Sequence, residues 1–272
     1  MVPLRPMSAA DVLDGGFRLL RAAPAAVLVP SLLVAVVVTV ADTALRLWLD
    51  ATTSVTVDER GFVEGSVLGP FLSGLLRQVL ASVVGTIGVA VIGAFVAGVL
   101  VCTLAGTRPT LGAVWAIVRS RLWVAAVVGL IVGAAQSVAL LFLVVPGVWL
   151  WVLLALAVPP TVVERASVGQ ALRRSTQVVG GGFWRVFGLR LLAALTAVAF
   201  GYLFRVPFTL LADQVESTTA QAAFLALGTL LTSAVVLPLR AGVDVMLYLD
   251  QRIRREAFDV SLTLAARPVG AP

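Results

Sequence analysis

The chain alternates long stretches without charged residues and shorter segments that hold most of its charges. Residues 25–41, 78–107 and 123–163 contain no Asp, Glu, Lys or Arg. A helix rises about 1.5 Å per residue, so roughly 20 apolar residues cross the hydrocarbon core of a bilayer. The third stretch is long enough for two crossings. The pattern predicts a multi-pass membrane protein.

We predict an all-α integral membrane protein with six transmembrane helices in a single domain, residues 1–260. The predicted spans are residues 23–47, 79–105, 122–144, 147–163, 186–208 and 220–248. The turn-like sequence Val-Pro-Gly at 145–147 should join the third and fourth spans as a tight antiparallel hairpin. Residues 49–66 form an outer loop with a small hairpin, residues 67–78 lie along or tilt in from the outer interface, and residues 261–272 form a flexible tail.

Three short segments that precede pairs of spans begin in a similar way. Residues 8–13, 110–115 and 167–172 each start with Ser or Thr, followed two positions later by Ala or Gly, and end on a large apolar residue. Ser8, Thr110 and Ser167 are suited to capping the first turn of a helix. In the first segment Leu13, Phe17 and Leu20 share one face. The repeat predicts three units, each a cytoplasmic amphipathic elbow helix followed by two transmembrane helices.

The composition and the placement of charge agree with this topology. Of 272 residues, 60% are hydrophobic and 12% are charged, about half the charged share of a soluble domain. The basic residues are all Arg, and they cluster on one side of the predicted spans. The positive-inside rule then places both termini in the cytoplasm, in a bacterial cytoplasmic membrane. Because these arginines flank apolar spans, we predict contact with anionic lipid headgroups and no nucleic-acid partner.

Three polar residues stand out within the predicted spans. Arg240 and Asp244 lie one turn apart in the last span, and Gln136 lies in the middle of the third. Charges within a span are functional candidates because their burial is costly. We favour a structural interpretation in which Arg240 and Asp244 neutralise each other near the cytoplasmic surface, while Gln136 donates an interhelical hydrogen bond.

Two further patterns concern surfaces. Arg173, Arg174 and Arg185, together with Trp184, form a basic cytoplasmic cluster that suits anionic lipid headgroups or a protein partner, although charges of this kind also simply set topology. Small residues spaced four apart favour close helix packing inside the protein over self-association. They are Thr86, Ala90, Ala94, Gly98 and Cys102, with Gly129 and Gly133 on the next span.

The missing residue types restrict the chemistry. The sequence has no His, so it has no His-ligated zinc site and no Ser-His-Asp triad. It has no Lys, so the Gly-x-x-x-x-Gly-Lys phosphate loop is excluded. We therefore predict a protein that is not an enzyme and uses no cofactor or metal.

Several segments resemble a bacterial family found frequently in actinobacteria, the membrane domain associated with glycerophosphoryl diester phosphodiesterases. They are Leu-Arg-Pro-Met-Ser at 4–8, Asp-Val-Leu-Asp-Gly at 11–15, Phe-Arg-Leu-Leu-Arg at 17–21, Val-Pro-Gly-Val-Trp at 145–149, Pro159-Pro160 through Glu164, Ala-Leu-Arg-Arg-Ser at 171–175 and the segment 247–256. The phosphodiesterase of that name is a separate barrel with catalytic histidines. The resemblance therefore implies a membrane module that stands alone, and no functional residue is carried over.

The sequence leaves three functional hypotheses. The first is a non-catalytic accessory or lipid-associated membrane module. The alternative is a small-molecule or lipid transporter or channel, which would need polar side chains along a path. The third is an intramembrane enzyme that acts on lipid headgroups with the carboxylates of the outer segment, Asp50, Asp58, Glu59 and Glu64. The oligomeric state and the spatial symmetry of the three units are left open.

Overall fold

The computed structural model describes residues 8–52, 56–57, 63–64, 68–142 and 144–256. The described chain is almost entirely helical, as predicted. Its helices are α1 (Ala9–Ala22), α2 (Pro24–Thr52), α3 (Leu68–Leu104), α4 (Leu111–Val118), α5 (Leu122–Phe142), α6 (Val144–Leu153), α7 (Pro159–Val163), α8 (Val168–Val179), α9 (Phe183–Ala212) and α10 (Thr218–Glu256), and its strands are β1 (Thr56–Val57) and β2 (Val63–Glu64).

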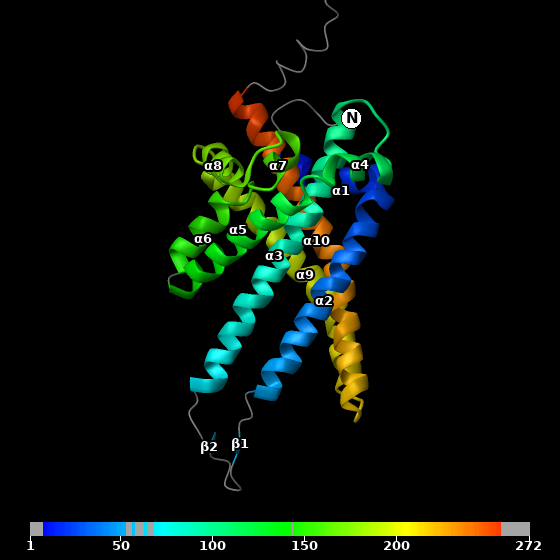
Figure 1. Ribbon diagram of the computed structural model, residues 1–272, viewed down its shortest axis with the longest axis vertical. Helices are drawn as coiled ribbons and strands as arrows, with labels where there is room; N and C mark the ends of the chain where they lie inside the picture. Colours follow the sequence, from blue (N-terminus) through cyan, green and yellow to red (C-terminus); the bar gives the residue numbers. More distant parts are fainter. Residues whose placement is uncertain (1–7, 53–55, 58–62, 65–67, 143, 257–272) are drawn as a thin grey trace, which may run out of the picture.

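Five of the described helices are long and apolar enough to cross a membrane, and this supports a multi-pass membrane protein. The stretches that qualify are Pro24–Leu49, Phe71–Leu104, Leu122–Ala139, Phe183–Ala212 and Thr218–Arg255. They form an elongated bundle, with the short helices α1, α4, α7 and α8 gathered at one end (Figure 1). We call this the basic end, and the opposite end, where α2 leads towards α3 and α9 turns into α10, the loop end.

The predicted fourth span, residues 147–163, is not a continuous helix. It is divided into α6 and the single short turn of α7, separated by residues 154–158. Pro159 and Pro160 lack backbone N–H groups and disfavour a helical residue before them, so the helix cannot continue through this position. Figure 1 shows the α5–α6 hairpin ending well short of the loop end that α2 and α3 reach.

The region around the outer loop also differs from the prediction. Residues 68–78 do not lie along the interface as a separate segment, because α3 is one helix from Leu68 to Leu104. The alternative, in which they tilt in from the interface, stays a prediction. Pro70 is tolerated there because it lies in the first helical turn, where backbone N–H groups have no intrahelical partner. The predicted small hairpin is present: β1 pairs antiparallel with β2, Thr56 opposite Glu64. The predicted flexible tail, 261–272, lies outside the described residues.

Three of the short helices at the basic end, α1, α4 and α8, begin where the repeat predicts. Ser8 and Ser167 each form a capping box, Ser8 with Asp11 and Ser167 with Gln170. Thr110 accepts a hydrogen bond from the backbone N–H of Ala113. The predicted apolar face of α1 is confirmed in part, because Leu13 and Leu20 pack against the core while Phe17 is exposed. Val12 and Leu19 are the fully buried apolar side chains of this helix.

The core lies in the basic-end half of the bundle, where small residues bring helices together. A Cβ on Gly129 of α5 would lie 2.6 Å from the Cβ of Ala90 on α3. Gly16 of α1 faces Gly242 of α10, and a Cβ on Gly16 would lie 3.2 Å from the Gly242 carbonyl carbon. The small-residue stripe on α3 therefore packs inside the protein, as predicted.

Candidate functional site

An ion pair between α9 and α10 is buried at the basic-end side of the bundle. Arg190 Nε lies 3.2 Å from Asp244 Oδ1, and the two side chains are 10% and 14% exposed. The guanidinium also lies 4.8 Å from the centre of the Trp151 ring and hydrogen-bonds the Trp151 carbonyl. Asp244 pairs directly with Arg190, which the tertiary structure brings from another helix. The predicted partner, Arg240, makes no hydrogen bond or salt bridge with Asp244 among the described residues, although its charge acts on the same carboxylate.

This ion pair adjoins the break between α6 and α7. Ser175 on α8 bridges the break, since its hydroxyl donates to the Leu153 carbonyl at 2.6 Å and accepts from the Leu156 N–H at 3.1 Å. Arg190 reaches α6 through the Trp151 carbonyl. Irregular backbone at membrane depth is tolerated where protein satisfies its polar groups. The broken hairpin is thus held by polar side chains of α8 and α9.

A second polar cluster holds the basic end together around two carboxylates. Arg174 Nε donates to both Glu164 carboxylate oxygens at 3.2 Å, and Tyr248 also hydrogen-bonds Glu164. Asp250 is fully buried between Arg185 at 2.9 Å and Arg254 at 3.0 Å. These pairs connect α7, α8 and α9 to the end of α10.

The predicted basic cluster therefore contains two kinds of residue. Arg174 and Arg185 form ion pairs with carboxylates of their own chain, so they connect helices to one another. Arg173 is exposed, and Trp184 is 79% exposed at the start of α9. Only these last two face outward as a headgroup-binding surface requires.

Gln136 is buried on α5, as expected for an interior polar residue. Its amide nitrogen has no hydrogen-bond partner among the described residues, so the predicted interhelical bond is absent from that part of the chain. The neighbouring Ser137 hydroxyl is also buried and has no hydrogen-bond partner among the described residues.

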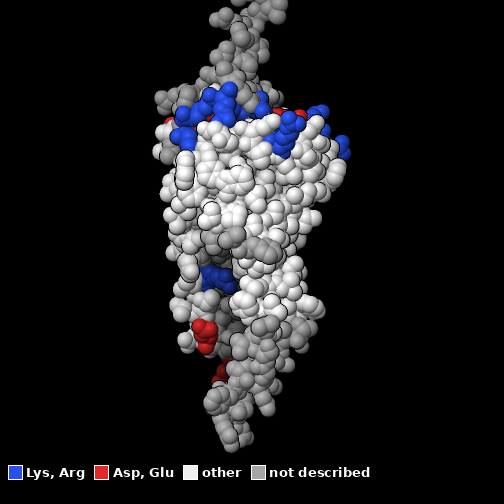
Figure 2. Space-filling model, turned by 90° about the vertical axis from the view of Figure 1, so that its left-hand side faces the viewer, with Lys and Arg blue, Asp and Glu red and all other residues white. Residues whose placement is uncertain are grey.

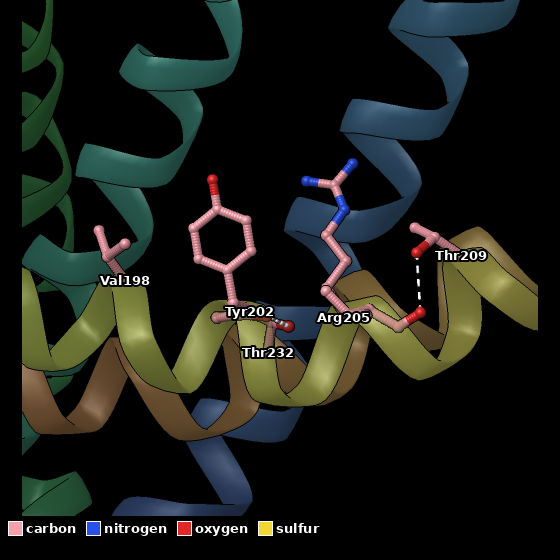
Figure 3. A pocket seen from close by; sticks show the side chains of 7 residues that line it. Val198, Tyr202, Arg205, Thr209 and Thr232 are labelled. Carbon is pink, nitrogen blue, oxygen red and sulfur yellow. Dashed lines mark hydrogen bonds between the residues drawn. The ribbon is translucent and has the colours of Figure 1, made fainter.

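A hollow in the loop-end half, mostly apolar with one arginine in its lining, was not predicted. A cavity of about 450 Å³ is lined by Val198, Gly201, Tyr202, Arg205, Val206, Thr209 and Thr232. Figure 3 shows Tyr202 and Arg205 projecting from the same side of α9. A second cavity of about 260 Å³ shares Arg205 and is lined also by Asp42 and Gln78.

Sequence reasoning missed both Arg190 and Arg205, although a signal was present. Both are charged residues within the predicted fifth span, and the same rule that drew attention to Arg240 applies to them. The sequence does not show the surroundings of these two residues. Arg190 pairs with a carboxylate, and Arg205 lines a cavity.

The charged side chains on the surface are also concentrated at the basic end. Figure 2 shows basic side chains in a layer at the basic end, an uncharged band below it, and isolated basic and acidic side chains nearer the loop end. Exposed arginines at the basic end include Arg21, Arg108, Arg119, Arg165 and Arg173.

Comparison of the chain with models of protein families, with curated proteins and with solved structures finds no match. The resemblance to the membrane domain associated with glycerophosphoryl diester phosphodiesterases therefore stays a prediction.

Proposed function

We propose that this chain is a non-catalytic, multi-pass protein of the bacterial cytoplasmic membrane that serves as an accessory, lipid-associated module. One observation carries the proposal: short amphipathic helices and exposed arginines gather at the same end of an apolar bundle (Figure 2). Such a surface attracts anionic lipid, by about 1 kcal/mol for each basic residue near the membrane. The resemblance stated above also supports a membrane module.

The proposal assigns the basic end, with both termini, to the cytoplasm. The helices α1, α4 and α8 then lie at the cytoplasmic interface as elbows that precede α2, α5 and α9. In this arrangement the α5–α6 hairpin takes the place of both spans of the middle unit, and it enters and leaves the membrane on the same side. The three-unit organisation is thus kept, with a re-entrant hairpin in place of two full spans.

Labelling of introduced cysteines tests this orientation. Cys102 is the only cysteine and is buried, so a Cys102→Ala background leaves one reactive thiol per variant. In right-side-out vesicles, an impermeant maleimide should label Asp213→Cys at the loop end and should not label Arg173→Cys. The reverse pattern would overturn the orientation.

The lipid association is tested by mass spectrometry of lipids that co-purify with the protein in native-membrane nanodiscs. Replacing Arg119, Arg121 and Arg173 together with Gln should deplete anionic lipid, by about 100-fold in affinity if each contributes about 1 kcal/mol. Arg77→Gln, an exposed arginine near the loop end, is the matched control and should retain it. An unchanged lipid profile in the triple variant would refute the proposal.

The same preparations test the accessory role. A stoichiometric protein that co-purifies with the native chain and is lost from the triple variant supports a partner at the basic end. Recovery of the chain with lipid alone removes the support for a protein partner and leaves the lipid association.

Transport is the second candidate function, and the break between α6 and α7 favours it. Discontinuous helices beside buried charges are characteristic of transporter binding sites, and here the break lies next to the Arg190–Asp244 pair. Flux measurements in proteoliposomes over a broad panel of small molecules and lipids test it. Flux that Ser175→Ala abolishes, in a protein that remains folded, would favour transport over the accessory role.

A further inference from the structure

Arg205 is a cation in an unusual position for a span that enters from the basic end. It lies on α9, which ends at Ala212, about 10 Å further along the helix axis. The positive-inside rule disfavours arginine on that side of a membrane. Its side chain is exposed, and among the described residues it makes no hydrogen bond or ion pair with the protein. Neither topology nor internal pairing accounts for it.

The short α5–α6 hairpin explains why Arg205 has space around it. At the basic end this hairpin lies beside α3, and α6 also contacts α9. Because the hairpin ends short of the loop end (Figure 1), the loop-end half of α9 has no helix at that position. The hollow therefore lies beyond the tip of the hairpin, where α5 ends at Phe142.

The lining of the larger cavity has the polarity of an amphiphile. Val198, Tyr202, Arg205 and Thr209 follow one another at intervals of four, three and four residues, which places them on one face of α9, as Figure 3 shows. Val198 lies towards the middle of the bundle and Thr209 towards the loop end. An apolar chain would thus meet Val198 while a polar head meets Arg205.

We propose that this cavity binds a phospholipid of the leaflet at the loop end, with its phosphodiester on Arg205. The guanidinium offers up to five N–H donors in a planar fork that matches phosphate oxygens. Tyr202 adds a hydroxyl donor, and its side chain has no hydrogen bond within the described part of the protein. Burial of an acyl chain against Val198 supplies the apolar part of the binding.

Size and charge favour the larger cavity as the seat of the headgroup. Its volume of about 450 Å³ lies in the range of roughly 300–1,000 Å³ typical of small-molecule sites, and its lining includes no carboxylate. The second cavity also has Arg205 in its lining, but it is smaller and is lined by Asp42 as well. A phosphate is therefore favoured on the Tyr202 side of the arginine.

This site is separate from the basic-end surface in the proposed function, and its test uses different residues. The native chain is reconstituted in proteoliposomes with a phosphatidylglycerol probe that carries a photoreactive group on one acyl chain. We expect crosslinks to α9 around Val198, and competition by unlabelled phosphatidylglycerol but not by diacylglycerol, which has the same tails and no phosphate.

Variants then assign the contact to Arg205. Arg205→Gln should reduce labelling of α9 by about tenfold or more, because hydrogen bonds to a charged group contribute roughly 1.5–3 kcal/mol. Arg205→Lys keeps the charge and should retain part of the labelling, and Tyr202→Phe should reduce it less than Arg205→Gln. Arg77→Gln is the matched control and should leave it unchanged.

Three results would overturn the proposal. The first is unchanged labelling of Arg205→Gln in a variant that elutes and melts as the native protein does. The second is competition by diacylglycerol equal to that by phosphatidylglycerol. The third is competition by inorganic phosphate at the same concentration as lipid, which would indicate a site for a water-soluble anion. The triple arginine variant at the basic end should label normally, so failure of either proposal is distinguishable from failure of the other.

Discussion

The two halves of the bundle differ in how closely their helices approach one another. In the basic-end half, α3 is buried over most of residues 90–102 and α10 over most of residues 237–253. In the loop-end half, a Cβ on Gly74 or Gly85 of α3 would meet nothing within 4 Å. The same helices run through both halves, so helix composition alone does not produce the difference.

The two halves differ in the helices that surround α3 and α10 and in the presence of ion pairs. The basic-end half contains α1, α4, α7, α8 and the α5–α6 hairpin in addition to the long helices (Figure 1). It also contains the ion pairs of Asp244, Asp250 and Glu164. The comparison suggests a rigid half that fixes the helices and an open half that exposes a site at its surface.

The largest effect is expected from breaking the buried ion pair. Asp244→Ala leaves Arg190 buried without its carboxylate, which should destabilise the protein by about 3–5 kcal/mol and lower its Tm by roughly 10 °C. Thermal unfolding in detergent micelles measures this change. Asp213→Ala, an exposed carboxylate at the loop end, is the control and should melt within a degree or two of the native chain. A native Tm for Asp244→Ala would show that the pair does not hold the rigid half.

Replacement of Gly by Ala should lower the stability of the protein in the basic-end half and raise it in the loop-end half. Gly129→Ala introduces a Cβ that would lie 2.6 Å from the Ala90 Cβ, and such overpacking costs about 1–3 kcal/mol. Gly85→Ala places a Cβ in open space, and the better helix propensity of Ala should stabilise α3 by about 0.5–1 kcal/mol. Unfolding of both variants under one set of conditions checks the comparison. Two shifts of the same sign would contradict it.

A smaller loss is expected from Ser175→Ala at the break between α6 and α7. The change leaves the buried Leu156 N–H and the Leu153 carbonyl without the hydroxyl that they share, which should cost about 1–3 kcal/mol. Thr176→Ala is the control, because Thr176 is exposed and its hydroxyl bonds only within its own helix. Hydrogen exchange should rise in residues 151–158 of Ser175→Ala alone, and uniform exchange across the chain would be evidence against a local role.

The smallest expected changes in stability are those for two adjacent arginines at the basic end, Arg173 and Arg174. Arg174→Gln removes the contact with Glu164 at 3.2 Å, and a partly exposed pair of this kind is worth up to about 1 kcal/mol. Arg173→Gln should change stability by less than about 0.5 kcal/mol, as for most surface positions. Melting curves of both variants test the distinction, and an equal loss in the two would show that the ion pair adds nothing.

Much of the fold follows from local sequence. Uninterrupted apolar runs gave the positions of α2, α3, α5, α9 and α10, because only a helix satisfies its backbone in an apolar environment. Ser8, Thr110 and Ser167 predicted the starts of three short helices, because a side-chain hydroxyl satisfies the free N–H groups of a first turn. Small residues at four-residue spacing predicted close helix packing on one face of α3, and the structure places α5 against that face.

The candidate site was less predictable because its members come from different helices. Arg240 lies one turn from Asp244, so the sequence favoured that pair, whereas Arg190 is distant in the chain and close in space. Arg174 and Arg185 read as a surface cluster because their partners, Glu164 and Asp250, lie on other elements.

For this protein the sequence by itself determined which long segments are helical, where α1, α4 and α8 begin, and which end of the bundle is basic. Each of these depends on neighbours within a few residues, through propensity, capping and hydrophobic length. The tertiary structure decided that the α5–α6 hairpin stops short, that Arg190 is the partner of Asp244, and that Arg205 lines a cavity. Those features depend on distances between helices, and side-chain packing across helices sets these distances once the chain has folded.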